Sequence, residues 1–87
     1  MSLSVEWEDD AVEGLDRLDL EIARRVIVKV RWLAHSFDSV RLKPLGGALK
    51  GYLRLRIGDY RAIYSVKRES NLLVVHFVGH RREVYRV

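Results

Sequence analysis

Two strand-like segments joined by only two residues constrain this chain more than any other feature. Residues 52–57 (YLRLRI) alternate in polarity, residues 60–67 (YRAIYSVK) are rich in aromatic and β-branched side chains, and Gly58-Asp59 lies between them. A two-residue connection that contains glycine is typical of a β-hairpin. Residues 72–78 (LLVVHFV) are almost continuously apolar, which predicts a central strand covered on both faces. The sequence therefore predicts three consecutive strands that pair in an antiparallel manner.

The residues before this hairpin predict one strand and two helices. Residues 3–8 alternate apolar with polar side chains, as in a half-buried strand. A first helix is predicted to begin at Asp9-Asp10, because Asp10 and Glu13 have the spacing of a capping box. Asp19 is the candidate cap of a second helix of about four turns, which ends near residues 35–36. The apolar face of this second helix is formed by Ile22, Val26, Val30, Leu33 and Phe37.

The order of these elements predicts an α+β fold. Residues 38–51 contain the only proline and three of the six glycines, which indicates a loop between the helices and the hairpin. A basic tail, residues 80–87, follows the last strand. The layout is β-α-α-β-β-β plus a tail, with a helical hairpin packed on a small, mainly antiparallel sheet. A length of 87 residues suits one domain, residues 1–87.

Composition excludes several classes of protein. The chain has no cysteine, so it has neither disulfides nor thiolate metal sites. With three scattered histidines, a structural zinc site is not expected, and neither is another metal or cofactor. No apolar run is long enough to span a membrane, and the acidic N-terminus differs from a signal peptide. We therefore expect a cytoplasmic protein.

Charge is distributed very unevenly along the chain. Residues 1–21 hold eight acids and one base, a net charge of −7, whereas residues 22–87 hold fifteen bases and four acids, a net charge of +11. Twelve of the sixteen bases are arginine, whose planar guanidinium suits phosphate groups. This imbalance indicates a polyanionic or acidic partner, although charge for solubility would give a similar composition.

The two-residue turn also fixes which side chains share a face of the hairpin. Arg56 is predicted to lie directly opposite Arg61, a like-charge pair that is unfavourable and that a bound anion would relieve. Residues 41–68 contain eight bases and one acid, which favours an anion site over an ordinary solvated face. Arg61 is expected to be exposed, so that its removal would leave the fold intact. One face is predicted to carry Tyr52, Arg54, Arg56, Arg61 and Ser65, and the core face Leu53, Leu55, Ile57, Tyr60, Ala62 and Tyr64.

The histidines of the last strand have different interpretations. His76 lies within an apolar segment, which is typical of a core histidine with satisfied hydrogen bonds. His80 follows Gly79 at the strand end, beside Arg81 and Arg82, where it can reach solvent and act in a site.

Two motifs together resemble the RelE/ParE toxin superfamily. Residues 50–64 (KGYLRLRIGDYRAIY) are similar to the central hairpin of that family, and residues 78–85 (VGHRREVY) to its C-terminal motif. The upstream strand, the two helices and the approach at residues 42–45 (LKPL) also fit. The resemblance covers essentially the whole chain and implies the toxin of a type II toxin–antitoxin system.

The resemblance assigns roles to individual residues. Arg61 matches a phosphate-binding arginine, Arg81 an arginine that stabilises charge or protonates the leaving group, and Tyr85 a tyrosine that places the nucleotide. Arg54 stands where RelE has a lysine implicated as the base, and Tyr52 where it has another lysine. The predicted catalytic residues are Arg54, Arg61, His80, Arg81 and Tyr85; the predicted substrate-binding residues are Lys50, Tyr52, Arg56 and Arg82.

The change from lysine to arginine at position 54 leaves the general base open. A guanidinium with a pKa above about 12 is a poor base. If the ribose 2′-hydroxyl attacks the phosphate, its proton goes to His80, to a perturbed Arg54, or to no side chain of the protein. In the last case the ribosome and the arginine clamp supply most of the rate enhancement.

The function that the resemblance implies is a metal-independent endoribonuclease that cleaves messenger RNA in the ribosomal A site. The expected protein partner is a RelB-like antitoxin that forms a hetero-oligomer with the toxin and blocks its basic face; no membrane is involved. ParE-like members of the superfamily instead inhibit DNA gyrase without nuclease activity. A third alternative is an inactive relative that only binds nucleic acid.

Overall fold

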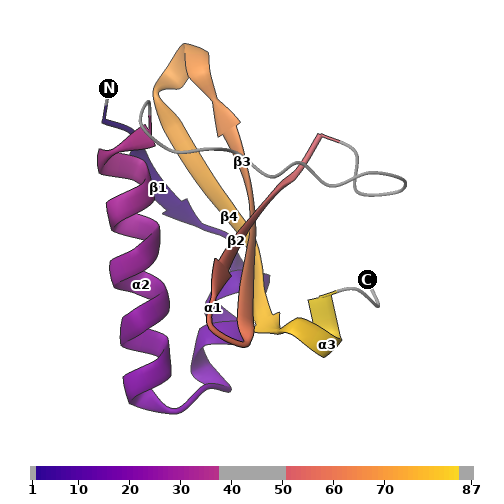
Figure 1. Cartoon of the computed structure of the whole chain (residues 1–87). Coiled ribbons are helices and arrows are strands. Elements are labelled where there is room, and N and C mark those ends of the chain that lie inside the picture. The colour runs from indigo at the N-terminus through magenta and orange to yellow at the C-terminus, as the bar shows by residue number, and fades with distance from the viewer. Residues whose placement is uncertain (1, 38–50, 85–87) are drawn as a thin grey trace.

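The computed structural model describes residues 2–37 and 51–84, which form a four-stranded sheet; two helices follow its first strand and a short helix follows its last (Figure 1). The elements are β1 (Ser4–Trp7), α1 (Asp9–Asp16), α2 (Leu20–His35), β2 (Leu53–Ile57), β3 (Tyr60–Lys67), the 3₁₀ helix η3 (Arg68–Ser70), β4 (Leu72–His80) and α3 (Arg81–Val84). The strand order is β1-β4-β3-β2. Strand β1 runs parallel to β4, and the other pairs are antiparallel. The predicted α+β fold with a mainly antiparallel sheet is confirmed.

Helices α1 and α2 share one hydrophobic core with one face of the sheet (Figure 1). The face of α2 predicted to be apolar is the buried one, since Val26, Val30 and Leu33 are almost fully buried. Strand β4 lies between β1 and β3, as its apolar sequence predicts. Full burial of a valine or leucine side chain, as in α2, stabilises the fold by about 1.5–3 kcal/mol. The core side chains from the sheet are Leu55, Ala62, Tyr64, Leu73, Val75 and Val78.

Close packing of α1 on β4 depends on Gly14. A Cβ atom built at this position would lie 2.1 Å from the carbonyl oxygen of Val78. No side chain fits at that distance, so glycine is required where the helix backbone meets the strand backbone. This contact fixes the height of α1 on the sheet, and with it the position of Glu8, the residue between β1 and α1.

The ends of several elements differ from the sequence prediction. Helix α1 begins at Asp9 with Glu8 as its N-cap, so Asp10 lies inside the helix and the predicted capping box is wrong. Asp19 does precede α2, but its side chain makes no capping hydrogen bond. Strand β4 continues two residues past the predicted end. The predicted turn at residues 68–71 is a short 3₁₀ helix closed by Asn71 in the left-handed conformation.

Within residues 2–37 and 51–84, no helix combines the length and the apolar character needed to cross a bilayer.

Candidate nucleic-acid interface

The arginine side chains of the hairpin lie on the sheet face opposite the core. Strand pairing places Arg54 opposite Ile63, Arg56 opposite Arg61, and Ile57 opposite Tyr60, in the register that the two-residue turn predicts. Gly58 has a φ of +57°, which suits the first loop position of a type II′ turn. We call this side of the sheet the arginine face; its side chains are Arg54, Arg56, Arg61, Ile63 and Ser65.

Arg61 is buried, and the expectation that it is exposed is wrong. Only 8% of its surface is accessible. Its Nη1 atom donates hydrogen bonds to the carbonyl oxygens of Gly58 and Tyr60, each at 2.8 Å. The guanidinium is therefore held against the hairpin turn, and two carbonyl dipoles offset its repulsion with the exposed Arg56 across the strand pair. These bonds use one nitrogen, and a guanidinium carries further donors that suit a phosphate.

The end of β4 brings a second group of basic residues to the same turn. The backbone N–H of Arg81 donates to the carbonyl oxygen of Asp59 at 2.8 Å, which ties the start of α3 to the β2–β3 connection. Arg81 and Arg82 are exposed, whereas Val84 is fully buried and anchors α3. Because Arg61 pairs with Gly79, only two residues before Arg81, two of the three predicted catalytic arginines, Arg61 and Arg81, lie at the same end of the sheet.

His80 lies on the other side of the sheet at this level. It pairs with Tyr60, and the two rings make an edge contact at 5.5 Å between centroids. Both line a small pocket with Gly14 and Leu18 of the α1 region. The Nδ1 atom of His80 accepts a hydrogen bond from the backbone N–H of Arg82 at 3.2 Å. The structure therefore does not bring His80 together with Arg54 and Arg61, although all three are predicted site residues.

A group of polar contacts on the arginine face centres on His76, whose place there was not predicted from the sequence. The ring of His76 contacts both the Ser65 hydroxyl and the Glu8 carboxylate, and it lies against the ring of Tyr52 with centroids 4.9 Å apart. His76 is therefore not a core residue, although its hydrogen bonds are satisfied as predicted. Two of the predicted site residues, Lys50 and Tyr85, lie outside the described residues.

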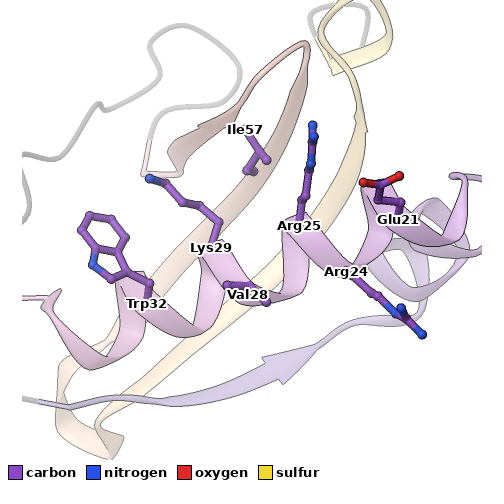
Figure 2. Close-up of a pocket in the computed structure, with 7 residues that line it drawn as sticks. All are labelled: Glu21, Arg24, Arg25, Val28, Lys29, Trp32 and Ile57. Atoms are coloured by element: carbon purple, nitrogen blue, oxygen red, sulfur yellow. The ribbon is translucent and has the colours of Figure 1, made fainter.

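A groove along α2 forms a second surface, separate from the arginine face. It has a volume of about 590 Å³ and lies between α2 and the end of β2 (Figure 2). Trp32 is 46% exposed there, and the Lys29 ammonium lies 4.4 Å from the centre of its ring. The residues that line the groove are Glu21, Arg24, Arg25, Val28, Lys29, Trp32 and Ile57.

Comparison with known proteins identifies the family. The model of the ParE toxin of type II toxin–antitoxin systems matches residues 5–85. This chain belongs to the ParE toxin family. None of the curated proteins matches the sequence at a significant level.

Solved structures of toxins resemble this family member over nearly its whole length. The toxin–antitoxin complex RelBE2 of Mycobacterium tuberculosis gives a TM-score of 0.80 with 28% identity, over 93% of each chain. A RelE–RelB complex of Pyrococcus horikoshii gives 0.71 with 26% identity, over 93% of this chain and 97% of the other. A variant of the Escherichia coli toxin RelE in the free state gives 0.78 with 19% identity, over 99% and 93%. The chain is thus a type II toxin of the RelE/ParE superfamily.

Proposed function

We propose that this toxin is an endoribonuclease that cleaves messenger RNA on the ribosome. The observation that carries the proposal is the meeting of two basic elements at one end of the arginine face. Arg61 is held rigidly at the hairpin turn, and the backbone of Arg81 is bonded to that same turn. Preorganised cations are the groups that stabilise charge developing on a phosphate during cleavage.

The chemistry of the proposed reaction needs no metal. The 2′-hydroxyl of a ribose attacks the adjacent phosphate, and arginine side chains hold this phosphate and its neighbours. We assign this role to Arg54, Arg61 and Arg81, with Arg56 and Arg82 binding the rest of the backbone. Lys50 and Tyr85 stay in the proposed substrate site on the basis of the sequence motif alone. Ribosomes and messenger RNA are cytoplasmic, so we place the toxin in the cytoplasm.

Cleavage of a 5′-labelled message on programmed ribosomes tests this function. We expect the wild-type toxin to cut within the A-site codon. Arg81→Ala should reduce the cleavage rate by about 100- to 1,000-fold, the usual effect of removing one preorganised electrostatic contact. Arg17→Ala is the matched control, because Arg17 is an exposed arginine at the end of α1, away from the arginine face. An intact message after incubation with the wild-type toxin would contradict the proposal.

The match to the ParE toxin model favours a second candidate, inhibition of DNA gyrase. A gyrase inhibitor needs a protein-binding surface but no phosphate chemistry, so the arginine face would have no catalytic role. The two functions are separated by incubating the toxin with gyrase and supercoiled DNA. Accumulation of gyrase-mediated DNA breaks, together with an uncut message, would establish the second candidate.

We further propose that the groove on α2 binds an acidic, amphipathic segment of a RelB-like antitoxin. Trp32 and Val28 offer exposed apolar surface, and three basic side chains surround them (Figure 2). An amphipathic helix that inserts apolar residues into such a groove is a common mode of peptide recognition. The complexes of related toxins with RelB antitoxins support a toxin–antitoxin hetero-oligomer.

A further inference from the structure

A row of polar side chains crosses the sheet at one level of the arginine face. The row begins at Glu8, the residue after β1, and continues through His76 on β4 and Ser65 on β3. It ends at Tyr52, just before β2. The members of this row come from four different parts of the chain, and each touches the next or the ring of His76.

A β-bulge turns His76 toward this row. Phe77 pairs with Ile63 and Val75 pairs with Tyr64, so β4 has one extra residue, His76, at this point. Bulges re-aim a side chain and occur often beside functional sites. The imidazole remains reachable from solvent, since 24% of its surface is accessible, and the Glu8 side chain is 50% exposed.

The hydrogen bonds of the row define the chemistry of the ring. A carboxylate can only accept, so the contact with Glu8 places the ring proton on Nδ1. Nε2 is then an acceptor, and the Ser65 hydroxyl donates to it at 2.6 Å. This tautomer is assigned from the network of partners. The order carboxylate, imidazole, hydroxyl is the arrangement by which proteins prepare an imidazole to remove a proton from a hydroxyl group.

We infer that His76 is the general base of the proposed ribonuclease, oriented by Glu8; this inference rests on the proposed function. In the free protein the Ser65 hydroxyl occupies the position that a ribose 2′-hydroxyl takes when RNA binds, and it leaves by rotation about one side-chain torsion. Arg54 lies one level from the row on the same face, where it holds the phosphate next to that ribose. His76 thus supplies the basic group that Arg54 cannot.

The step balances without a metal or a cofactor. The 2′-hydroxyl proton moves to Nε2 of His76 while the 2′-oxygen forms a bond to phosphorus. The bond from phosphorus to the 5′-oxygen breaks, and that oxygen takes a proton from water. Glu8 stabilises the imidazolium until it returns its proton to solvent. The products are a 2′,3′-cyclic phosphate and a 5′-hydroxyl end.

Single-turnover cleavage on programmed ribosomes tests the inference. We expect His76→Ala to reduce the rate by about 100-fold or more, the usual contribution of a general base. His76→Gln, which keeps a polar side chain at the bulge, should lose a similar factor, and Glu8→Gln should lose less. His35→Ala is the control, since His35 is exposed at the end of α2.

Two readouts separate a catalytic role from a structural one. The wild-type rate should rise with pH, because a general base acts in its unprotonated form, and both His76 variants should lose this rise. Among the described residues, the charged and polar groups in contact with the ring are Glu8 just after β1, Ser65 on β3 and Tyr52 just before β2, and Arg54 on β2 lies on the same face. Added imidazole should restore cleavage by His76→Ala, because Glu8 remains to orient it. Melting curves show whether each variant is folded.

The outcomes distinguish failure of this inference from failure of the proposed function. If the wild-type toxin leaves the message intact, the proposed function fails. If it cleaves and Arg81→Ala is impaired, but folded His76→Gln keeps both the rate and the pH dependence, the inference alone is overturned. It is also overturned if His80→Ala, rather than His76→Ala, removes the pH dependence.

Discussion

Arg61→Ala should destabilise the toxin substantially, even though the sequence predicts an exposed side chain at this position. Arg61 is 8% exposed, and its guanidinium donates two hydrogen bonds of 2.8 Å to the turn. A hydrogen bond to a charged group contributes about 1.5–3 kcal/mol. Because Gly58 is exposed, the freed carbonyl groups regain water, so the low end applies and the loss is about 3 kcal/mol.

Removing Arg61 also removes its repulsion with Arg56, which offsets part of this loss in the free energy of unfolding. Opposed like charges on neighbouring strands cost about 0.2–1 kcal/mol, so the net destabilisation is about 2 kcal/mol. A domain of this size has a total stability of about 4–13 kcal/mol, and each kcal/mol lowers the melting temperature by about 4–8 °C. We therefore expect Arg61→Ala to remain folded at 25 °C and to melt about 8–16 °C below the wild type.

Thermal unfolding followed by circular dichroism measures this shift. Arg56→Ala is the matched control, because Arg56 is the directly opposed arginine and is exposed; its melting temperature should change by less than about 4 °C. The reasoning is refuted if Arg61→Ala melts within about 3 °C of the wild type, or if both variants are equally destabilised. Cleavage by Arg61→Ala must be measured well below its melting temperature, so that a lost phosphate contact is separated from unfolding.

Three further predictions concern α1, the core and the groove on α2. Gly14→Ala should destabilise the toxin by about 1–3 kcal/mol or more in chemical denaturation, because the new Cβ overlaps the carbonyl oxygen of Val78. This cost exceeds the gain from the better helix propensity of alanine. The control Val12→Ala, on the exposed side of α1, should change stability much less. Burial raises the pKa of Tyr64 to about 12. The neutral hydroxyl therefore contributes on the order of 2–3 kcal/mol to the free energy of unfolding below pH 10, and this contribution is lost as the pH rises from about 10 to 12. Unfolding curves of Tyr64→Phe should lack this part of the alkaline loss, and curves identical to those of the wild type would contradict the prediction. Trp32→Ala should weaken antitoxin binding by about 10-fold or more, and raising the salt concentration should slow association, since the groove is basic; a flat response to salt in surface plasmon resonance would instead indicate an interface held by apolar contacts.

The sequence alone determined the local elements and the hairpin register. A two-residue turn leaves only one way to pair the flanking strands, so the opposition of Arg56 and Arg61 follows from Gly58-Asp59. The apolar spacing in residues 20–35 likewise defines α2 and its buried face. These features depend on residues close together in the chain, where periodicity and turn chemistry are sufficient.

The tertiary structure decided which polar side chains meet. Glu8 and His76 are 68 residues apart and come together only because β1 pairs in parallel with β4. The bulge that turns His76 out of the core has no mark in an almost continuously apolar segment. The burial of Arg61 depends on its bonds to the turn carbonyls, and the place of His80 beside Tyr60 depends on the pairing of β3 with β4. Strand order and bulges are set by the free energy of the whole packed sheet, and a local sequence pattern does not contain that information.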